Sequence, residues 1–319
     1  MCKWHCGSKI GVKVKNSIPQ IQIIPLQDDY LSIRHHGREI LGWNASRQSP
    51  RPYFFPVVGP TGQSITRMGH PAAADHGHHR SFWWGHNSVA GVDFWAEKQK
   101  PGNHPHVRQD NWFHLQDGEE EAAVACQLGW FDSQQVKLIN QKLIFTVKPL
   151  ANNELWIEIQ TDFTPTTKEL LLGKTNFGFM GLRVSKNISA RFGNGVLRSS
   201  EGFETEKNIF AKSARWMDYS GTNYPGKIEG VTWFDHPSNP RHPVCWHVRD
   251  DGWMSPAFCL EKEVLLKQSE PLSLWYGLHV HAGDYNKEVA EHHFVNFKKS
   301  LRPSLEKGES PWPYKITRK

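Results

Sequence analysis

Histidines crowd into one short part of the chain, together with tryptophans. Five of the 18 histidines fall within 17 residues, at His70, His76, His78, His79 and His86. Charged and indole side chains lie among or just after them: Asp75, Arg80, Trp83, Trp84, Asp93 and Trp95. Imidazole titrates near neutrality and is the commonest metal ligand, whereas indole offers a large apolar face with one donor. This mixture predicts a site for a polar ligand, and the alternative is a loop of structural histidines and tryptophans.

The run DHGHH, residues 75–79, leaves open which imidazoles face a ligand. If the run is extended, His76 and His78 point to one side and His79 to the other, so at most two of the three face one ligand. We select His79 as the catalytic candidate because it adjoins Arg80, with His78 as the alternative inward residue. Clustered imidazoles and arginines repel added protons, so at least one of these histidines should stay neutral at pH 7.

Two further histidines are spaced for one face of a strand. The segment PLSLWYGLHVHAG, residues 271–283, alternates between Leu, Tyr or Val side chains and a second face that carries Trp275, His279 and His281. The His279 and His281 pair can bracket a metal or a substrate hydroxyl. The alternative is two histidines on a solvent-facing surface.

A proline-rich loop leads into another polar strand, in which Cys245, His247 and Arg249 share one face. The fixed donor fork of Arg249 suits an anionic or polyhydroxylated ligand, and the alternative is a buried salt bridge to Asp235 or Asp250.

The segment ARWMDYSG, residues 214–221, combines an indole with a guanidinium and a carboxylate. Indole faces stack on the apolar faces of sugar rings, while charged groups take sugar hydroxyls, so this composition favours carbohydrate over a purely apolar ligand. The alternative is an ordinary strand and turn.

The elements that must position these residues have the period of strands. The segments ELWIEIQTDF (154–163) and QKLIFTVK (141–148) alternate apolar and polar residues, and turn-forming clusters punctuate the chain. Helix-period segments are short, the best near Lys287 to Phe297. We predict an all-β fold: a large antiparallel β-sandwich of supersandwich, galactose-mutarotase-like or jelly-roll type, with few short helices. Residues 1–301 are expected to form one domain, and residues 302–319 an extended C-terminal tail.

Composition narrows the class of protein. Of the 319 residues, 38% are hydrophobic and 22% charged, which is typical of a globular chain. No run approaches the ~18–20 apolar residues of a membrane span, and the N-terminal residues lack the apolar core of a signal peptide, so we expect a soluble, cytoplasmic protein. The net charge of +6 comes partly from the two ends, and no nucleic-acid motif is present. A homo-oligomer is possible.

Cysteine usage and missing motifs limit the chemistry further. The five cysteines are an odd number without framework spacing, which indicates free thiols in a reducing compartment. Cys2 and Cys6 could clip a metal with His5, although a frayed terminus is the simpler interpretation. The sequence contains none of four familiar motifs: the G-x-S-x-G elbow of serine nucleophiles, the Walker loop of nucleotide-binding proteins, C-x-x-C and H-E-x-x-H. Any metal should therefore be held by imidazoles and carboxylates, at Zn–N distances near 2.0–2.1 Å for zinc, rather than by thiolates.

Several blocks, in order, resemble a bacterial family of unknown function that is labelled methane oxygenase PmoA, or PmoA-like. They are RPYFFPVVGPTGQSITR, DHGHHRSFWWGH, VAGVDFW, ARWMDYSG, DHPSNPRHPVCWHVR and VHAG, between Arg51 and Phe297. A proline is usual in the family at Gly77 and an asparagine at Ala90. This hydrophilic chain differs from the membrane-embedded monooxygenase subunit, because it has no span. The resemblance marks these positions as characteristic: Asp75, His76, His78, His79, Arg80, His86, Asp93, Trp95, Asp218, Tyr219, Arg241, His247, Arg249 and His281.

The leading hypothesis is a carbohydrate-active enzyme, a lyase or hydrolase acting on a sugar or oxidised sugar by histidine acid/base catalysis. The expected catalytic residues, which should line one common pocket, are His79, Arg80, His247, Arg249 and His281. The expected substrate-binding residues are Trp84, His86, Asp93, Trp95, Asp218, Tyr219 and Arg241. Two alternatives are a non-catalytic carbohydrate-binding β-sandwich and a metal-dependent oxygenase. The latter would hold a divalent metal through His76, His78 and either His279 or His281.

Overall fold

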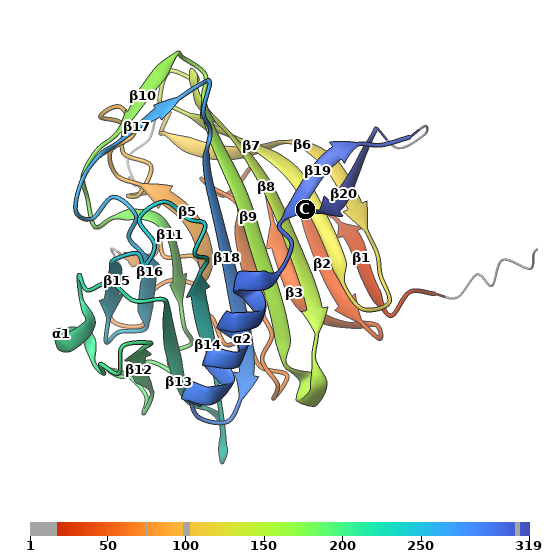
Figure 1. The fold of residues 1–319 in the computed structure, drawn as a ribbon, viewed down its shortest axis with the longest axis vertical. Coiled ribbons are helices and arrows are strands. Elements are labelled where there is room, and N and C mark those ends of the chain that lie inside the picture. Colours follow the sequence, from red (N-terminus) through yellow and green to blue (C-terminus); the bar gives the residue numbers. More distant parts are fainter. Residues whose placement is uncertain (1–17, 74–75, 98–102, 310–312) are drawn as a thin grey trace, which may run out of the picture.

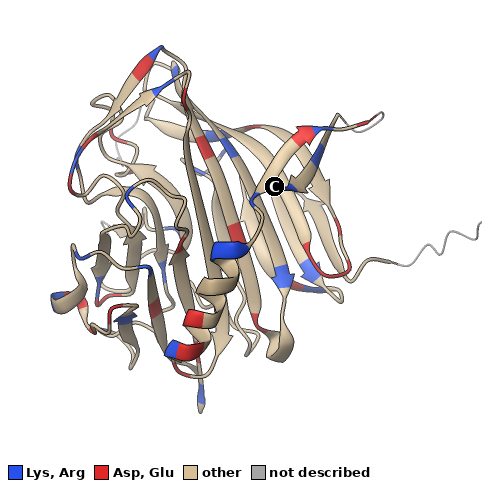
Figure 2. Cartoon of the chain, viewed as in Figure 1, with Lys and Arg blue, Asp and Glu red and all other residues tan. Residues whose placement is uncertain are grey.

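Two eight-stranded antiparallel sheets pack face to face in the computed structural model, which describes residues 18–73, 76–97, 103–309 and 313–319 (Figure 1). The predicted all-β sandwich is confirmed. Basic and acidic residues are interspersed along both sheets (Figure 2). Within the described residues, none of the helices has the length and apolar character needed to cross a membrane.

The first sheet runs, in spatial order, through β1 (Ile21–Leu26), β2 (Tyr30–His35), β3 (Arg38–Asn44), β4 (Tyr53–Val57), β5 (Phe82–His86), β11 (Gly178–Arg183), β16 (Trp253–Pro256) and β15 (Trp246–Arg249). The second runs through β12 (Val196–Ser199), β13 (Trp216–Tyr224), β14 (Lys227–Asp235), β18 (Leu272–Ala282), β9 (Leu155–Pro165), β8 (Lys137–Pro149), β7 (Ala122–Phe131) and β6 (His106–Gln116). Two small ribbons pair β10 (Glu169–Leu172) with β17 (Val264–Lys267), and β19 (Pro303–Lys307) with β20 (Tyr314–Arg318). The described helices are η2 (Ala151–Asn153), α1 (Glu206–Ile209) and α2 (Lys287–Lys299).

The main core lies between the two sheets and follows the predicted alternation. In β18 the inward side chains are Leu272, Leu274, Tyr276, Leu278 and Val280. The apolar faces of β8 and β9 join the same core. Period two therefore leaves His279 and His281 on the outer face of the second sheet.

Part of the outer face of the second sheet, around β13, β14 and β18, is covered by α2, close to where a helix was expected (Figure 1). Trp216 and Trp275 pack there against Phe294 and Phe297. The helix begins at Asn286, whose side-chain oxygen accepts hydrogen bonds from the backbone N–H groups of the first turn.

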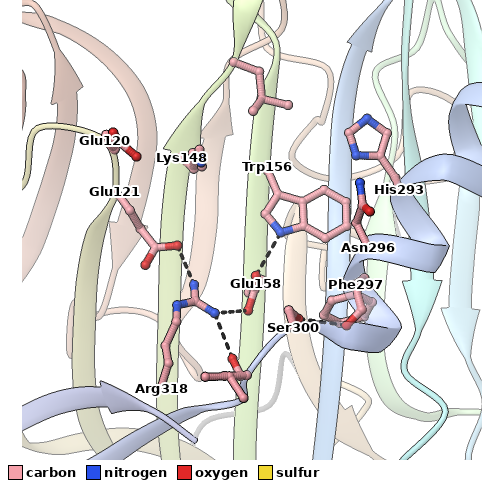
Figure 3. A pocket seen from close by; sticks show the side chains of 12 residues that line it. Glu120, Glu121, Lys148, Trp156, Glu158, His293, Asn296, Phe297, Ser300 and Arg318 are labelled. Carbon is pink, nitrogen blue, oxygen red and sulfur yellow. Dashed lines mark hydrogen bonds and ion pairs between the residues drawn. The ribbon is translucent and has the colours of Figure 1, made fainter.

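The C-terminal segment, expected as an extended tail, forms the β19–β20 ribbon. Arg318 of β20 donates to Glu121 at 2.5 Å and to Glu158 at 3.0 Å, and these acids lie on the second sheet (Figure 3). These ion pairs fasten the ribbon to the sandwich. At the other end of the chain, Cys2, His5 and Cys6 lie outside the described residues.

The outer face of the first sheet carries a separate aromatic cluster of Tyr53, Trp83, Trp95 and Trp253. Close packing here requires glycine at position 181, because a Cβ atom on that residue would lie 1.8 Å from the Trp253 ring. The benzene ring of the Trp253 indole therefore packs directly against the backbone of β11 at Gly181. This aromatic layer is the floor on which the polar residues of the first sheet are arranged.

We predict that Gly181→Ala displaces Trp253 and lowers the free energy of unfolding by about 1–3 kcal/mol, as overpacking does in other cores. Urea unfolding followed by tryptophan fluorescence measures this. The double variant Gly181→Ala/Trp253→Phe should recover part of the loss, because the smaller ring leaves room for the methyl group. Full stability of Gly181→Ala alone would contradict the packing described.

Candidate functional site

A cleft of about 320 Å³ opens on the outer face of the first sheet, above the aromatic floor. We call it the histidine cleft. Its walls are His76, His78, His79, Asn87, Asp93, Trp95, Ala96, Phe177, Arg183, His247, Arg249, Asp251 and Trp253. Strands β11, β15 and β16 of the first sheet meet here with the segments that connect them to their neighbours, so residues more than 150 positions apart in sequence share a surface.

Strand alternation directs polar side chains of the first sheet to this face. In β15, Trp246 and Val248 enter the core, so His247 and Arg249 point outward. Arg183 at the end of β11 is on the same face. Trp95, which belongs to the aromatic floor, is positioned by Asp93, whose carboxylate accepts the backbone N–H of Trp95 at 2.7 Å.

The sequence reasoning missed the most buried charge of the cleft, Arg183, whose side chain is 1% exposed. Its Nη1 lies 2.5 Å from Oδ1 of Asp251, and its guanidinium also donates to Nδ1 of His79. Asp251 in turn lies 3.0 Å from Nε2 of His70. Burial alone would raise the pKa of Asp251, but Arg183 and His70 outweigh it, so the carboxyl is held ionised. The sequence did contain one signal for this residue: a single arginine ends the apolar segment GFMGLR, and a charge buried in such a strand needs a partner.

Arg183 determines which ring nitrogen of His79 carries the proton. A guanidinium can only donate, so Nδ1 of His79 must be the acceptor, and the ring proton is on Nε2. Burial, and then the charge of Arg183, strongly lower the pKa of His79. His79 is therefore a neutral imidazole with an Nε2–H donor.

His247 has the opposite arrangement. Its Nδ1 lies 2.7 Å from the backbone carbonyl oxygen of Asn176, and a carbonyl can only accept, so Nδ1 carries the proton. Burial, followed by the charge of Arg249, lowers the pKa of His247 to about 4. Its Nε2 is therefore an unprotonated acceptor at neutral pH. The rings of His79 and His247 lie 4.9 and 6.2 Å from the Trp253 ring, centroid to centroid, so a donor and an acceptor imidazole share one floor.

His76, His78 and His79 all line the cleft, contrary to the expectation for an extended run. The segment turns at this point, because the backbone N–H of His79 donates to the carbonyl of His76. Ring centroids lie 4.2 Å apart for His78 and His79 and 5.7 Å apart for His76 and His78. The neighbouring Asp75 lies outside the described residues.

Three residues predicted for the site do not reach the histidine cleft. Arg80 points into a neighbouring cavity and donates two hydrogen bonds of 2.9 Å to Glu97. Trp84 alternates with Trp83 along β5 and is buried between the sheets, so it cannot stack on a ligand. His86 is completely buried, with Nε2 3.1 Å from the Gly173 carbonyl oxygen.

The predicted convergence of His281 with the cleft is also wrong, because the sandwich separates them. Nε2 of His281 lies 2.9 Å from Oδ2 of the buried Asp218, on the outer face of the second sheet. His279 pairs there with Glu154 at 2.8 Å. These residues border a separate cavity of about 250 Å³ next to α2.

Two other predicted binding residues are structural. Tyr219 is a core residue whose hydroxyl donates to the carbonyl oxygen of Asp250 at 2.9 Å. Arg241 donates to three backbone carbonyls, of Phe258, Lys262 and Glu263. Neither side chain borders the histidine cleft.

The metal ligands proposed from the sequence do not come together either. His279 and His281 lie across the sandwich from His76 and His78. Over residues 18–73, 76–97, 103–309 and 313–319, no three His, Cys, Asp or Glu side chains are grouped so that they could hold a metal ion. The three described cysteines, Cys126, Cys245 and Cys259, are buried free thiols.

Comparison with known proteins places the chain in a family. Residues 30–295 match the model of the "Family of unknown function (DUF6807)". The chain belongs to this family. The family description assigns no activity and mentions no methane oxygenase, and no curated protein matches the chain.

Two solved structures have a distant likeness to this member of the DUF6807 family. A GalM/aldose epimerase homologue from C. elegans is 11% identical, with a TM-score of 0.30, over 81% of this chain and 96% of that chain. A putative kojibiose phosphorylase from the human microbiome is 8% identical, with a TM-score of 0.30, over 88% of this chain and 36% of that chain. Scores this low carry no argument, so the sandwich rests on the strand pairing described above.

The His281–Asp218 pair should stabilise the fold rather than serve the cleft. We predict that His281→Ala lowers the free energy of unfolding by about 3 kcal/mol, because it leaves a buried carboxylate without its charged partner. Burial lowers the pKa of His281, but Asp218 outweighs it, and the net pKa is raised. The loss should therefore be largest below pH ~6.5 and shrink as the pH rises through the raised pKa.

Chemical denaturation at several pH values measures this effect, with the exposed His292→Ala as the control, expected within about 0.5 kcal/mol of wild type. A stability difference that grows with pH would contradict a charged His281.

Proposed function

We propose that this DUF6807 member is a carbohydrate-active enzyme, a lyase or hydrolase, that binds a sugar or oxidised sugar in the histidine cleft. The proposal rests on the hydrogen-bond partners of two imidazoles on one aromatic floor, Arg183 for His79 and the Asn176 carbonyl for His247, which assign the two rings opposite tautomers. Acid/base chemistry needs an acceptor for one proton and a donor for a developing charge, and His247 and His79 supply these two functions.

In the proposed reaction Nε2 of His247 accepts a proton, either from a carbon next to a sugar carbonyl or carboxylate, or from an attacking water. The C–O bond to the leaving group then breaks, and the protonated His247 returns its proton to the leaving oxygen. The Nε2–H of His79 donates a hydrogen bond to the oxygen on which negative charge develops. Arg183, which donates to the other nitrogen of His79, makes that N–H a stronger donor. His79 thus acts as the electrophilic donor, whereas its resting tautomer leaves it no lone pair facing the cleft with which to act as the base.

The remaining cleft residues suit a polyhydroxylated ring. The indoles of Trp95 and Trp253 and the ring of Phe177 offer faces for the apolar side of a sugar. Arg249, whose side chain is 39% exposed and lies 2.9 Å from Glu206, can bind a carboxylate or vicinal hydroxyls at the cleft edge. A non-catalytic sugar-binding module would need these aromatic and charged groups, but not two imidazoles held neutral in opposite tautomers.

A metal-dependent oxygenase, as the PmoA label states, is the alternative that rests on His76 and His78, which lie side by side at the cleft wall. Elemental analysis of tag-free protein separates the two proposals. A stoichiometric metal that is lost from a His76→Ala/His78→Ala variant would favour the oxygenase.

Substitution of the two imidazoles tests the acid/base proposal once a substrate has been found by tryptophan-fluorescence screening of neutral and oxidised sugars. We predict that His247→Gln and His79→Gln each lower kcat by about 10²–10⁴-fold, while the dissociation constant changes by less than about threefold. The exposed His292→Gln is the control and should keep wild-type kcat. Full turnover by both cleft variants would refute catalysis and leave the binding-module interpretation.

The pH dependence provides an independent test. The base must be neutral to act, and the pKa of His247 is lowered to about 4. We predict that kcat/KM is constant from about pH 5 to pH 7 and falls about tenfold per unit below about pH 4. An acid limb centred near pH 6.5, the value of an unperturbed imidazole, would exclude His247 as the base.

A further inference from the structure

A second compartment adjoins the histidine cleft. This cavity of about 470 Å³ shares two of its lining residues, Asp93 and Ala96, with the cleft. Ala96 is exposed, so the two spaces meet at an open rim rather than across a buried wall. Each compartment alone falls in the size range of small-ligand pockets. A ligand longer than one sugar ring can therefore lie across the rim with a part in each.

The second compartment differs chemically from the first. Its lining includes the amide side chains of Gln48, Asn103 and Gln135, the guanidinium groups of Arg80 and Arg108, and the carboxylates of Asp93 and Glu97. It lacks the tryptophans that form the floor of the histidine cleft. Amides and a guanidinium bind hydroxyls and anionic groups through hydrogen bonds, so this compartment suits the polar edge of a ligand.

Arg108 is the charge that the protein itself leaves unneutralised here. Its Nη1 donates to the backbone carbonyl of Ser49 at 2.7 Å. Of the two acids in the lining, Glu97 pairs with Arg80, and Asp93 accepts the backbone N–H groups of Trp95 and Ala96. Asp110, two residues along β6, pairs with Lys137. Over the part of the chain that the structure describes, no carboxylate lies within ion-pair distance of Arg108. Part of its donor fork thus remains for an anionic group on a ligand.

We propose that the substrate is an acidic saccharide of at least two units, whose reacting unit lies in the histidine cleft and whose carboxylate binds Arg108. This inference rests on the proposed function, because it assigns the sugar site to the cleft. The saccharide crosses the rim at Asp93 and Ala96. Specificity then comes from the anionic group in the second compartment, whereas the reacting unit lies beside His79 and His247.

Binding of a matched set of probes tests the inference. Galacturonate, digalacturonate and neutral cellobiose are titrated by calorimetry against wild type, Arg108→Gln, Arg108→Lys and the exposed control Arg38→Gln. We expect digalacturonate to bind wild type at least tenfold more tightly than galacturonate. Arg108→Gln should weaken digalacturonate by about tenfold and cellobiose by less than twofold, as expected when one charge-assisted contact is lost. Arg108→Lys, which keeps the charge, should be intermediate, and Arg38→Gln should match wild type.

The outcomes separate the two proposals. Equal affinity for galacturonate and digalacturonate, unchanged in Arg108→Gln, would overturn the second compartment as a subsite. The proposed function would survive that result if Trp95→Ala still weakened galacturonate. Failure of every saccharide to bind wild type at millimolar concentration would overturn both. A last outcome concerns phosphate. If galactose 1-phosphate bound more tightly than digalacturonate, and Arg108→Gln abolished this preference, the anionic group recognised by Arg108 would be a phosphate and the acidic-saccharide assignment would be overturned.

Discussion

The buried guanidinium of Arg183 is the constraint on which the candidate site depends. A charge that is 1% exposed must be neutralised, and Asp251 does so at 2.5 Å. His70 holds Asp251, while the rest of the guanidinium fork meets His79. The backbone of β11 also anchors the loop that precedes β5, since the N–H of Arg183 donates to the carbonyl of Ser81. The backbone of Arg183 therefore anchors this loop, while its side chain, held by Asp251, orients the His79 imidazole and fixes its tautomer.

The two outer faces of the sandwich use similar residues for different purposes. On the first sheet, aromatic rings form a floor, and the polar residues above it border an open cleft. On the second sheet, α2 covers the face, and His279 and His281 each pair with a carboxylate beside it. An imidazole that is already paired with an acid serves packing and stability. By contrast, among the described residues no carboxylate pairs with Nε2 of His247, and the Asn176 carbonyl contacts its other ring nitrogen, Nδ1.

The sequence predicted local structure well, because period two is a local signal. It identified core strands at residues 141–148, 154–163 and 271–283, the outward faces of β15 and β18, and the helix near residue 287. It could not show which sheet each strand joins, because β5 pairs with β11 across about ninety residues of chain. Without knowledge of sheet membership, the sequence analysis placed both His247 and His281 beside His79. The structure confirms this for His247 and contradicts it for His281. The only sequence signal for Arg183 is its place at the end of an apolar strand, and its pairing with distant residues shows what that charge does.

The central claim is that His79 and His247 are neutral at pH 7 in opposite tautomers. Nitrogen-15 NMR of the histidine rings tests it directly, with signals assigned from His79→Gln and His247→Gln spectra. The account predicts a protonated Nε2 and bare Nδ1 for His79, and a protonated Nδ1 and bare Nε2 for His247. Two rings in the same tautomer, or either ring doubly protonated at pH 7, would contradict it.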